Sequence, residues 1–128
     1  MTVTATQDPP PVRTIARDEL LSKISASSRD PNLKLVFCLN AWSYRRKRIP
    51  TSIHFETPER MLAALKKDDE IVVYCTNEAC HQSLDAYKLL VAHGYTDVRR
   101  YAGGINDWEE GDLPLEGDWM HGDAHDET

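Results

Sequence analysis

The sequence predicts an α/β domain in which a central, mostly parallel β-sheet is flanked by helices. Short apolar runs at 33–39 and 71–74 are typical of strands that are covered on both faces. Segments with helical spacing of apolar residues lie between and after these runs, so that strands and helices alternate along the chain. The length of 128 residues is that of one ordinary domain.

The first quarter of the chain predicts one helix and one strand after an irregular start. Residues 1–13 include a Thr- and Pro-rich stretch, and we expect them to be a disordered leader. Apolar residues at helical spacing predict a helix from Ile15 to Ile24, with Thr14 as its cap. The apolar run at 33–39 is then the first strand of the sheet.

The next part of the chain predicts a helix in front of the second buried strand. Residues 40–48 are polar and basic, and we expect no regular element there. A short extended piece is expected at 53–55, followed by a helix over 58–67 with apolar residues on one face. The run at 71–74 is short and β-branched, as a buried strand requires.

The last part of the chain predicts a helix, a strand and a short helix. The helix is expected at 83–93, with Ser83 as its cap and Gly94 just past its end. A strand at 97–101 and a short helix starting at 105 follow. The folded domain is therefore expected over residues 14–117, and residues 118–128 are expected to form an acidic tail.

Charge and hydropathy argue against several classes of function. The net charge is −6, but residues 109–128 carry eight acidic and no basic residues, which leaves 15 basic against 13 acidic residues and a charge of +2 elsewhere. Because nucleic-acid binding needs a basic face, and the single basic run is 45–48, we expect no nucleic-acid partner. No run approaches the ~20 apolar residues that span a bilayer. The start of the chain has no apolar signal segment, so a cytoplasmic protein without a membrane partner is expected.

Cys75 is the residue that the sequence singles out for chemistry. It directly follows the strand at 71–74, and reactive groups gather beyond the carboxyl ends of parallel strands. We expect the loop after it to turn backbone N–H groups toward its sulfur, with the positive end of the next helix behind them. Such surroundings lower a cysteine pKa from ~8.5 to about 3.5–7.5, which makes Cys75 a thiolate nucleophile. The predicted binding loop consists of Thr76, Asn77, Glu78, Ala79, Cys80 and His81.

The alternative for Cys75 is an inert cysteine at the end of a buried strand. We expect that state for Cys38, which lies inside the apolar run at 35–39. The polar loop and the helix that follow Cys75 favour the nucleophile instead. His81 is interpreted as a surface histidine, with donation to a bound anion as the alternative.

Motifs spread over the chain match the pattern of one known family. They are Ile49-Pro50 with Ile53-His54, Ile71-Val72-Val73-Tyr74-Cys75, the helix from Ser83 to Leu90, His93-Gly94-Tyr95, and Gly103-Gly104-Ile105-Asn106-Asp107-Trp108. On these motifs the chain resembles the rhodanese homology domain over about residues 14–117. The resemblance implies a three-layer α/β fold around a central parallel sheet.

The resemblance also implies a sulfurtransferase that works through Cys75. Its thiolate attacks a sulfane-sulfur donor such as thiosulfate or a persulfide, carries the sulfur as a Cys75 persulfide, and passes it to a thiol or to cyanide. Partners would be small sulfur compounds or a persulfide-carrying protein. No metal and no organic cofactor is implied.

The chain also departs from the family pattern at three places. An Asp-x-Arg pair usually ends the second strand, and Phe37 and Leu39 stand there instead, so we expect packing to replace that polar network. The active loop is usually shorter and often ends in Arg, whereas no Arg lies between Cys75 and Ser83. Glu78 would repel a dianion such as thiosulfate by about 1–4 kcal/mol at ~4 Å, which favours a persulfide as donor; the alternative is that Glu78 points to solvent.

Cys80 introduces alternatives to simple sulfur transfer. Five positions from Cys75, it can reach the Cα separation of about 4.4–6.8 Å that a disulfide needs. It would then be a resolving thiol that attacks a persulfide or sulfenic acid on Cys75, or one half of a redox switch; otherwise it only fills the loop. A non-catalytic binding module is a further alternative, favoured by the departures from the family pattern.

Two other classes of site are disfavoured. A phosphatase of related fold needs an Arg where His81 stands. A zinc site of Cys75, Cys80, His81 and either His54 or His93 lacks any recognised ligand spacing.

Overall fold

A central sheet of four parallel strands organises the domain. The computed structural model describes residues 12–25, 33–77 and 79–118. The strands lie in the order β2-β1-β3-β4, and every neighbouring pair is parallel. They are β1 (Leu33–Phe37), β2 (Ser52–His54), β3 (Glu70–Tyr74) and β4 (Val98–Tyr101). The predicted α/β class is therefore confirmed.

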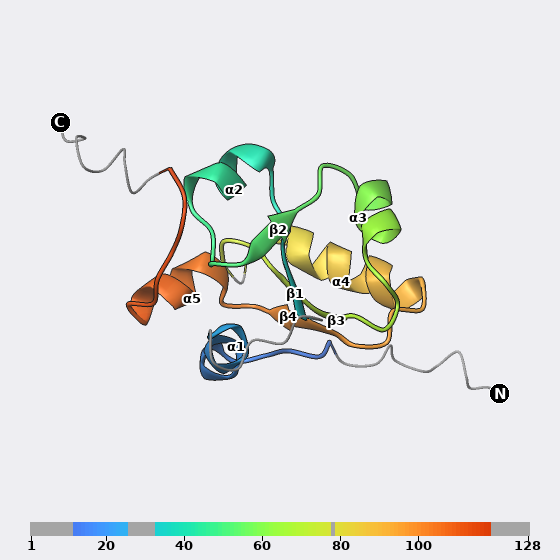
Figure 1. Ribbon diagram of the computed structural model, residues 1–128, viewed down its shortest axis with the longest axis horizontal. Helices are drawn as coiled ribbons and strands as arrows, with labels where there is room; N and C mark the ends of the chain where they lie inside the picture. The colour runs from blue at the N-terminus through green and yellow to red at the C-terminus, as the bar shows by residue number, and fades with distance from the viewer. Residues whose placement is uncertain (1–11, 26–32, 78, 119–128) are drawn as a thin grey trace.

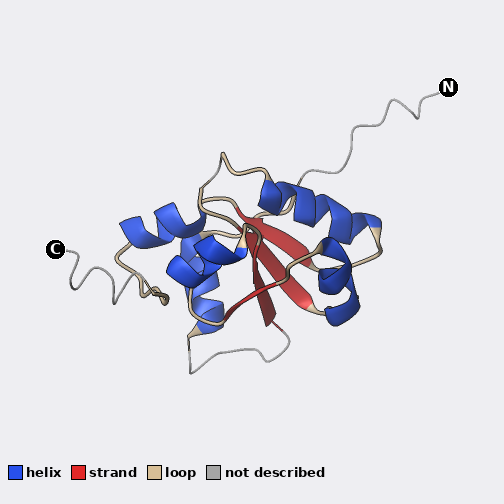
Figure 2. Cartoon of the chain, turned by 90° about the horizontal axis from the view of Figure 1, so that it is seen from above, coloured by secondary structure: helices blue, strands red, loops and turns tan. Residues whose placement is uncertain are grey.

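Helices cover both faces of this sheet, as Figures 1 and 2 show. They are α1 (Arg17–Ile24), α2 (Ala41–Arg46), α3 (Pro58–Ala64), α4 (Gln82–Ala92) and α5 (Gly104–Glu110). Among the described residues, none of the helices has the length and apolar character that crossing a membrane requires. The predicted leader and tail fall mostly on 1–11 and 119–128, which lie outside the described residues.

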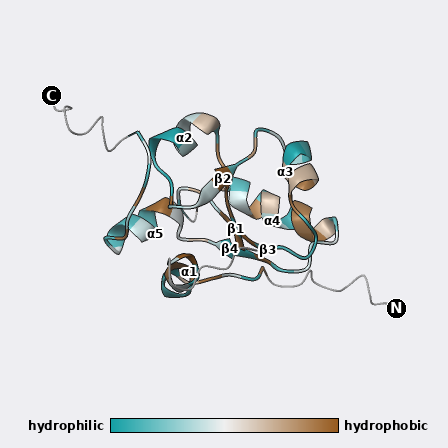
Figure 3. Ribbon diagram, in the orientation of Figure 1, coloured by the Kyte–Doolittle hydropathy of each residue, from teal (hydrophilic) through white to brown (hydrophobic). Residues whose placement is uncertain are grey.

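The side chains of the central strands alternate between two apolar cores. Phe37 and Tyr74 belong to the core under α1 and α5, where Trp108 is fully buried. Val36 and Val73 face the opposite side and pack with residues of α3 and α4. In Figure 3 the central strand β1 is largely apolar, and the helices carry both apolar and hydrophilic residues. Because each large apolar side chain contributes about 1.5–3 kcal/mol on full burial, these cores fix the ends of β1 and β3 in place.

The segment before α1 lies along the outer edge of β4. The N–H of Ile15 donates to the Arg100 carbonyl (3.1 Å), and the N–H of Arg100 donates to the Arg13 carbonyl (2.8 Å). Thr14 forms a parallel bridge with Arg100 and does not cap α1, whose N-cap is Ala16 without a side-chain hydrogen bond. The predicted cap was wrong because sheet pairing extends the backbone at this point.

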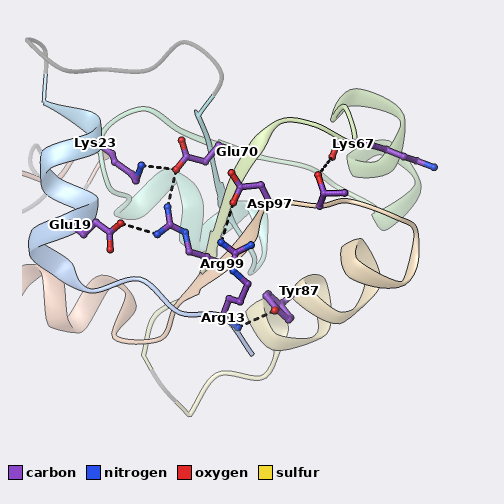
Figure 4. Close-up of polar contacts among 9 residues, drawn as sticks. Arg13, Glu19, Lys23, Lys67, Glu70, Tyr87, Asp97 and Arg99 are labelled. Carbon is purple, nitrogen blue, oxygen red and sulfur yellow. Dashed lines mark hydrogen bonds and ion pairs between the residues drawn. The ribbon is translucent and has the colours of Figure 1, made fainter. Parts of the chain in front are cut away.

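An ion-pair cluster fastens α1 to the sheet near the start of β3, and Figure 4 shows its members. Arg99 on β4 donates to Glu19 (2.9 Å) and to Glu70 (2.8 Å), and Lys23 lies 2.7 Å from Glu70. The hydrogen bond and the charge of Arg99 lower the pKa of Glu19. The cluster lies at the opposite end of β3 from Cys75, so we assign it a structural role.

Helix α2 lies within residues 40–48, where no regular element was expected, so that expectation was wrong. The Asn40 side chain accepts the N–H of Ser43 (2.8 Å), which caps the helix. None of its residues is fully buried, so apolar periodicity could not indicate it. The helix predicted at 58–67 is shorter, because α3 ends at Ala64.

Candidate active site

Cys75 lies at the carboxyl edge of the sheet, directly after β3. It is buried, with 1% of its surface exposed, and it starts the loop that leads into α4. The N–H groups of Ile105 and Asn106 on α5 donate to the carbonyls of Cys75 (3.1 Å) and Thr76 (2.9 Å). The start of α5 therefore fixes the backbone on which the candidate nucleophile lies.

Gly104 makes this approach of α5 possible. Its φ is +62°, and a Cβ at this position would lie 2.3 Å from the Cys75 carbonyl oxygen. Only a residue without a side chain fits so close to the loop backbone. The Gly103-Gly104 motif of the sequence thus has a direct structural role at the site.

A disulfide joins Cys75 to Cys80. The two Cα atoms are 6.2 Å apart, within the range predicted from the spacing of five residues. The loop between them turns around Asn77, whose carbonyl accepts the N–H of Cys80 (3.1 Å) and whose Oδ1 accepts the N–H of Ala79 (2.9 Å). The structure thus brings the two loop cysteines together, as the resolving-thiol and redox hypotheses both require.

The backbone N–H groups of the loop point in another direction in the disulfide form than was predicted around a Cys75 thiolate. The N–H groups of Ala79 and Cys80 bind Asn77 and are not directed at a Cys75 anion. A bonded sulfur carries no charge, so the loop has no anion to surround in this form. The thiolate with converging amides belongs to the reduced loop and stays a prediction.

The other predicted loop residues differ in exposure. Thr76 and Asn77 are half-buried, whereas Ala79 and His81 are exposed. His81 is the N-cap residue of α4 without a side-chain capping bond, in keeping with its interpretation as a surface residue. Glu78, and with it the predicted repulsion of thiosulfate, lies outside the described residues.

Arg100 on β4 is a site residue that the sequence analysis missed. Its Nε donates to Ser83 Oγ (2.9 Å), and its Nη2 donates to the Cys80 carbonyl (3.2 Å). Ser83 is therefore not the cap of α4, as predicted, but a buried residue of its first turn that accepts from Arg100. Arg100 thus holds the far end of the loop from the neighbouring strand. A charged residue on the inner face of a short strand was the available signal.

Packing occupies the end of β1, where the resemblance implied a polar pair. Phe37 is buried, with its ring centre 5.2 Å from that of Tyr74, and Leu39 packs against the same core. The Tyr74 hydroxyl accepts the N–H of Ile49 (3.0 Å) and also contacts Ser52 Oγ. Burial raises the pKa of Tyr74, which stays a neutral phenol. The residue before Cys75 is thus anchored by packing and hydrogen bonds, as expected from Phe37 and Leu39.

Cys38 lies beside the site but is chemically different from the loop cysteines. Its N–H donates to the Tyr74 carbonyl (2.8 Å), which places it next to Cys75 across the sheet. The thiol is free and half-buried, and it lines a cavity of about 280 Å³ between β1, α3 and α4. Burial raises the pKa of Cys38 to about 12, so it is a protonated thiol, in line with the expectation of an inert cysteine.

The opposite side of the site carries an aromatic and basic surface on α2. Trp42 is 61% exposed, and the Arg46 guanidinium lies 5.0 Å from the centre of its ring. These two residues line a cavity of about 200 Å³ together with Thr76 and Asn106. Within the described part of the chain, no group of three or more His, Cys, Asp or Glu side chains is arranged to hold a metal ion.

Comparison with solved structures identifies the same fold in several bacterial and archaeal proteins. BH2092 from Bacillus halodurans has a TM-score of 0.75 and 24% identity, over 84% of this chain and 78% of that one. The rhodanese-like domain of Alr3790 from Anabaena sp. has a TM-score of 0.73 and 21% identity, over 84% and 80%. A rhodanese-related protein from Thermoplasma volcanium has a TM-score of 0.65 and 20% identity, over 81% and 97%. No curated protein matches the sequence.

The family comparison covers most of the described domain. The model of the rhodanese-like domain matches residues 18–111, which contain all five helices apart from the first residue of α1, all four strands and the Cys75 loop. The match extends over more than half of the 128 residues. The chain therefore belongs to the rhodanese-like domain family.

Proposed function

We propose that this protein is a sulfurtransferase that carries a sulfane sulfur as a persulfide on Cys75. The observation that carries the proposal is the position of Cys75 at the carboxyl end of β3, at the head of the loop before α4, in a rhodanese-like fold. The nucleophile is the reduced thiolate, so the Cys75–Cys80 disulfide must be opened before a donor can react.

The reaction needs two transfers of one sulfur atom. The Cys75 thiolate attacks the outer sulfur of the donor, and the bond from that sulfur to the rest of the donor breaks, with sulfite or a thiolate as leaving group. A thiol or cyanide then takes the outer sulfur from the persulfide and restores the thiolate. Amides at the start of α4 would stabilise the negative charge of the persulfide.

The surface beside the loop supports anionic small sulfur compounds or a persulfide-carrying protein as substrates. Trp42 and Arg46 lie next to Thr76 and offer an aromatic face with a positive charge. The positive charge of Arg46 in such a surface attracts an anionic donor.

The test is intact-mass spectrometry of the reduced protein after treatment with thiosulfate or an organic persulfide. In a Cys80→Ser background, in which the loop disulfide cannot form, we expect a gain of one sulfur atom. An additional Cys75→Ser substitution abolishes this gain, and the matched control Cys38→Ser retains it. If none of these sulfane donors gives the adduct and peroxide does not close the loop, a non-catalytic binding module becomes the favoured function.

A second candidate function, a thiol redox switch, is favoured by the disulfide itself. Mild peroxide would convert Cys75 to a sulfenic acid. The Cys80 thiol would then attack the Cys75 sulfur, and the hydroxyl group would leave as water to form the disulfide. Under this function, peroxide closes the loop of the reduced protein, and both Cys75→Ser and Cys80→Ser prevent the loss of two hydrogens. Closure of the wild-type loop by peroxide, without any sulfur adduct from sulfane donors on the Cys80→Ser protein, would favour the switch over sulfur transfer.

A further inference from the structure

The loop disulfide is covered at one end and accessible at the other. Cys75 is 1% exposed, whereas Cys80 is half-buried. Cys80 Sγ lies 3.1 Å from Gln82 Oε1, and that contact is at the exposed surface. Its described neighbours Ala79, His81 and Gln82 are exposed too. A thiol that approaches from solvent therefore reaches the sulfur of Cys80 first.

The surrounding elements hold both cysteines where their sulfur atoms meet. The Cys75 carbonyl is fixed by the Ile105 N–H of α5, and the Cys80 carbonyl is fixed by Arg100 of β4. A persulfide on Cys75 retains the Cys75 Sγ as its inner sulfur. Cys80 is therefore positioned to attack that inner sulfur with the surrounding helices and strands in place.

We infer that Cys80 discharges the Cys75 persulfide as sulfide, and that a dithiol reductant then reopens the resulting disulfide by attack on Cys80. The inference rests on the proposed function, because it needs the persulfide. It assigns a catalytic role to Cys80 and makes a dithiol, rather than cyanide or a single thiol, the electron donor of the site.

The first step balances without any external oxidant. The Cys80 sulfur forms a bond to Cys75 Sγ, and the bond between that Sγ and the outer sulfur breaks. The outer sulfur leaves with the electron pair and takes up the proton from the Cys80 thiol, as HS⁻. Two electrons pass from the pair of cysteines to the sulfane sulfur, and the disulfide remains.

The second step restores the nucleophile. A thiolate of the reductant attacks Cys80 Sγ, and Cys75 leaves as a thiolate. The second thiol of the reductant then attacks the mixed disulfide, which releases the Cys80 thiol and the oxidised reductant. A dithiol is favoured because its second attack is intramolecular and has a high effective concentration. In sum, one sulfane sulfur and one dithiol give hydrogen sulfide and one disulfide.

The discharge step is tested in a Cys38→Ser background, which leaves the loop cysteines as the only thiols. The reduced protein is mixed with thiosulfate or an aromatic thiosulfonate, whose leaving groups are sulfite and sulfinate, so that sulfide arises only from the transferred sulfur. With no added thiol, we expect one sulfide per chain and a final mass two hydrogens below that of the reduced protein.

The matched controls replace Cys80 by Ser and, separately, by Ala. Both variants are expected to keep the added sulfur and to release sulfide at least tenfold more slowly. Equal release with and without Cys80 would overturn the inference while leaving the proposed function intact. Absence of the sulfur adduct in both Cys80 variants would overturn the proposed function, and the inference with it.

The point of attack is tested on the disulfide form with limiting glutathione and an acid quench. The tryptic peptide 68–88 contains both loop cysteines, and its fragmentation locates the mixed disulfide. We expect glutathione on Cys80. Its location on Cys75 would show that the reductant does not enter from the exposed end.

Discussion

Three cysteines in one small domain have three different surroundings. Cys75 is buried and held by α5, Cys80 is half-buried on the loop, and Cys38 lies at the wall of an apolar cavity. The sequence already distinguished Cys38, inside an apolar run, from the two cysteines of a polar loop. It left open whether Cys75 and Cys80 pair, because spacing alone does not fix the direction of the two side chains.

The raised pKa of Cys38 predicts a loss of stability at alkaline pH. The folded protein keeps this thiol protonated up to a pKa of about 12, whereas the unfolded chain ionises it near 9.0. As the pH rises above 9.0, the unfolded state loses its proton first, so the free energy of unfolding falls. Between pH 8 and 10 we expect this thiol to account for about 1 kcal/mol of that fall.

The free energy of unfolding is measured with urea at pH 8 and at pH 10. Its fall between the two pH values is compared in proteins with and without Cys38→Ala, both of which carry Cys75→Ser and Cys80→Ser to prevent disulfide exchange. The contribution of tyrosines such as Tyr74 is common to both proteins and cancels. Equal losses in the two proteins would contradict a raised pKa of Cys38.

At the scale of the elements, regular patterns were predictable and tertiary contacts were not. β3 and α4 follow from an apolar run and from helical spacing, and both are present within about one residue of the prediction. α2 was missed because it has no buried residue and therefore no apolar face with helical spacing. The Asn40 cap was the local signal for it. The role of Arg100 was missed because it depends on how β4 lies against the start of α4.

The close contact between α5 and the Cys75 loop gives a prediction for Gly104→Ala. At a φ of +62°, with the new Cβ 2.3 Å from the Cys75 carbonyl, the substitution forces the loop and the helix apart. We expect the free energy of unfolding to fall by about 1–3 kcal/mol. Urea unfolding measures it, with Gly111→Ala as control.

Gly111 is a suitable control because the atoms nearest to a Cβ there belong to the flexible side chain of Arg17. Its φ of −85° is also open to alanine. If both variants lost the same stability, the contact at Gly104 would have no special importance for the loop.

For the whole molecule, the disulfide is an addition to a fold that the cores already stabilise. It joins residues only five positions apart, and closing so short a loop is worth about 2 kcal/mol in the chain-entropy model. Reduction is therefore expected to lower the free energy of unfolding by about that amount and to leave the domain folded. Two apolar cores on opposite faces of the sheet remain intact.

This prediction is checked by urea unfolding with and without a strong reductant. The free energy of unfolding of the Cys80→Ser variant should be the same with and without the reductant, since this variant has no loop disulfide to lose. Global unfolding of the wild-type chain on reduction would show that the bond is structural, which would also argue against a loop that opens and closes during turnover.

The family and the chemistry were predictable to different degrees. The order of strands and helices, together with the Tyr74-Cys75 and Gly103–Trp108 motifs, was enough to predict the rhodanese-like fold. The chemical state of the loop was not, because a thiolate and a disulfide arise from the same residues and differ only by two electrons and two protons.

The pairing of residues 13–15 with β4 has a consequence for how the molecule behaves among other copies of itself. An unpaired outer strand displays a row of backbone donors and acceptors that can anneal to a neighbouring chain. Here the segment before α1 occupies that row, and the opposite border is formed by β2, which is only three residues long. A chain shortened beyond Ile15 would uncover β4, so resistance to aggregation depends on a stretch of sequence remote from the chemistry.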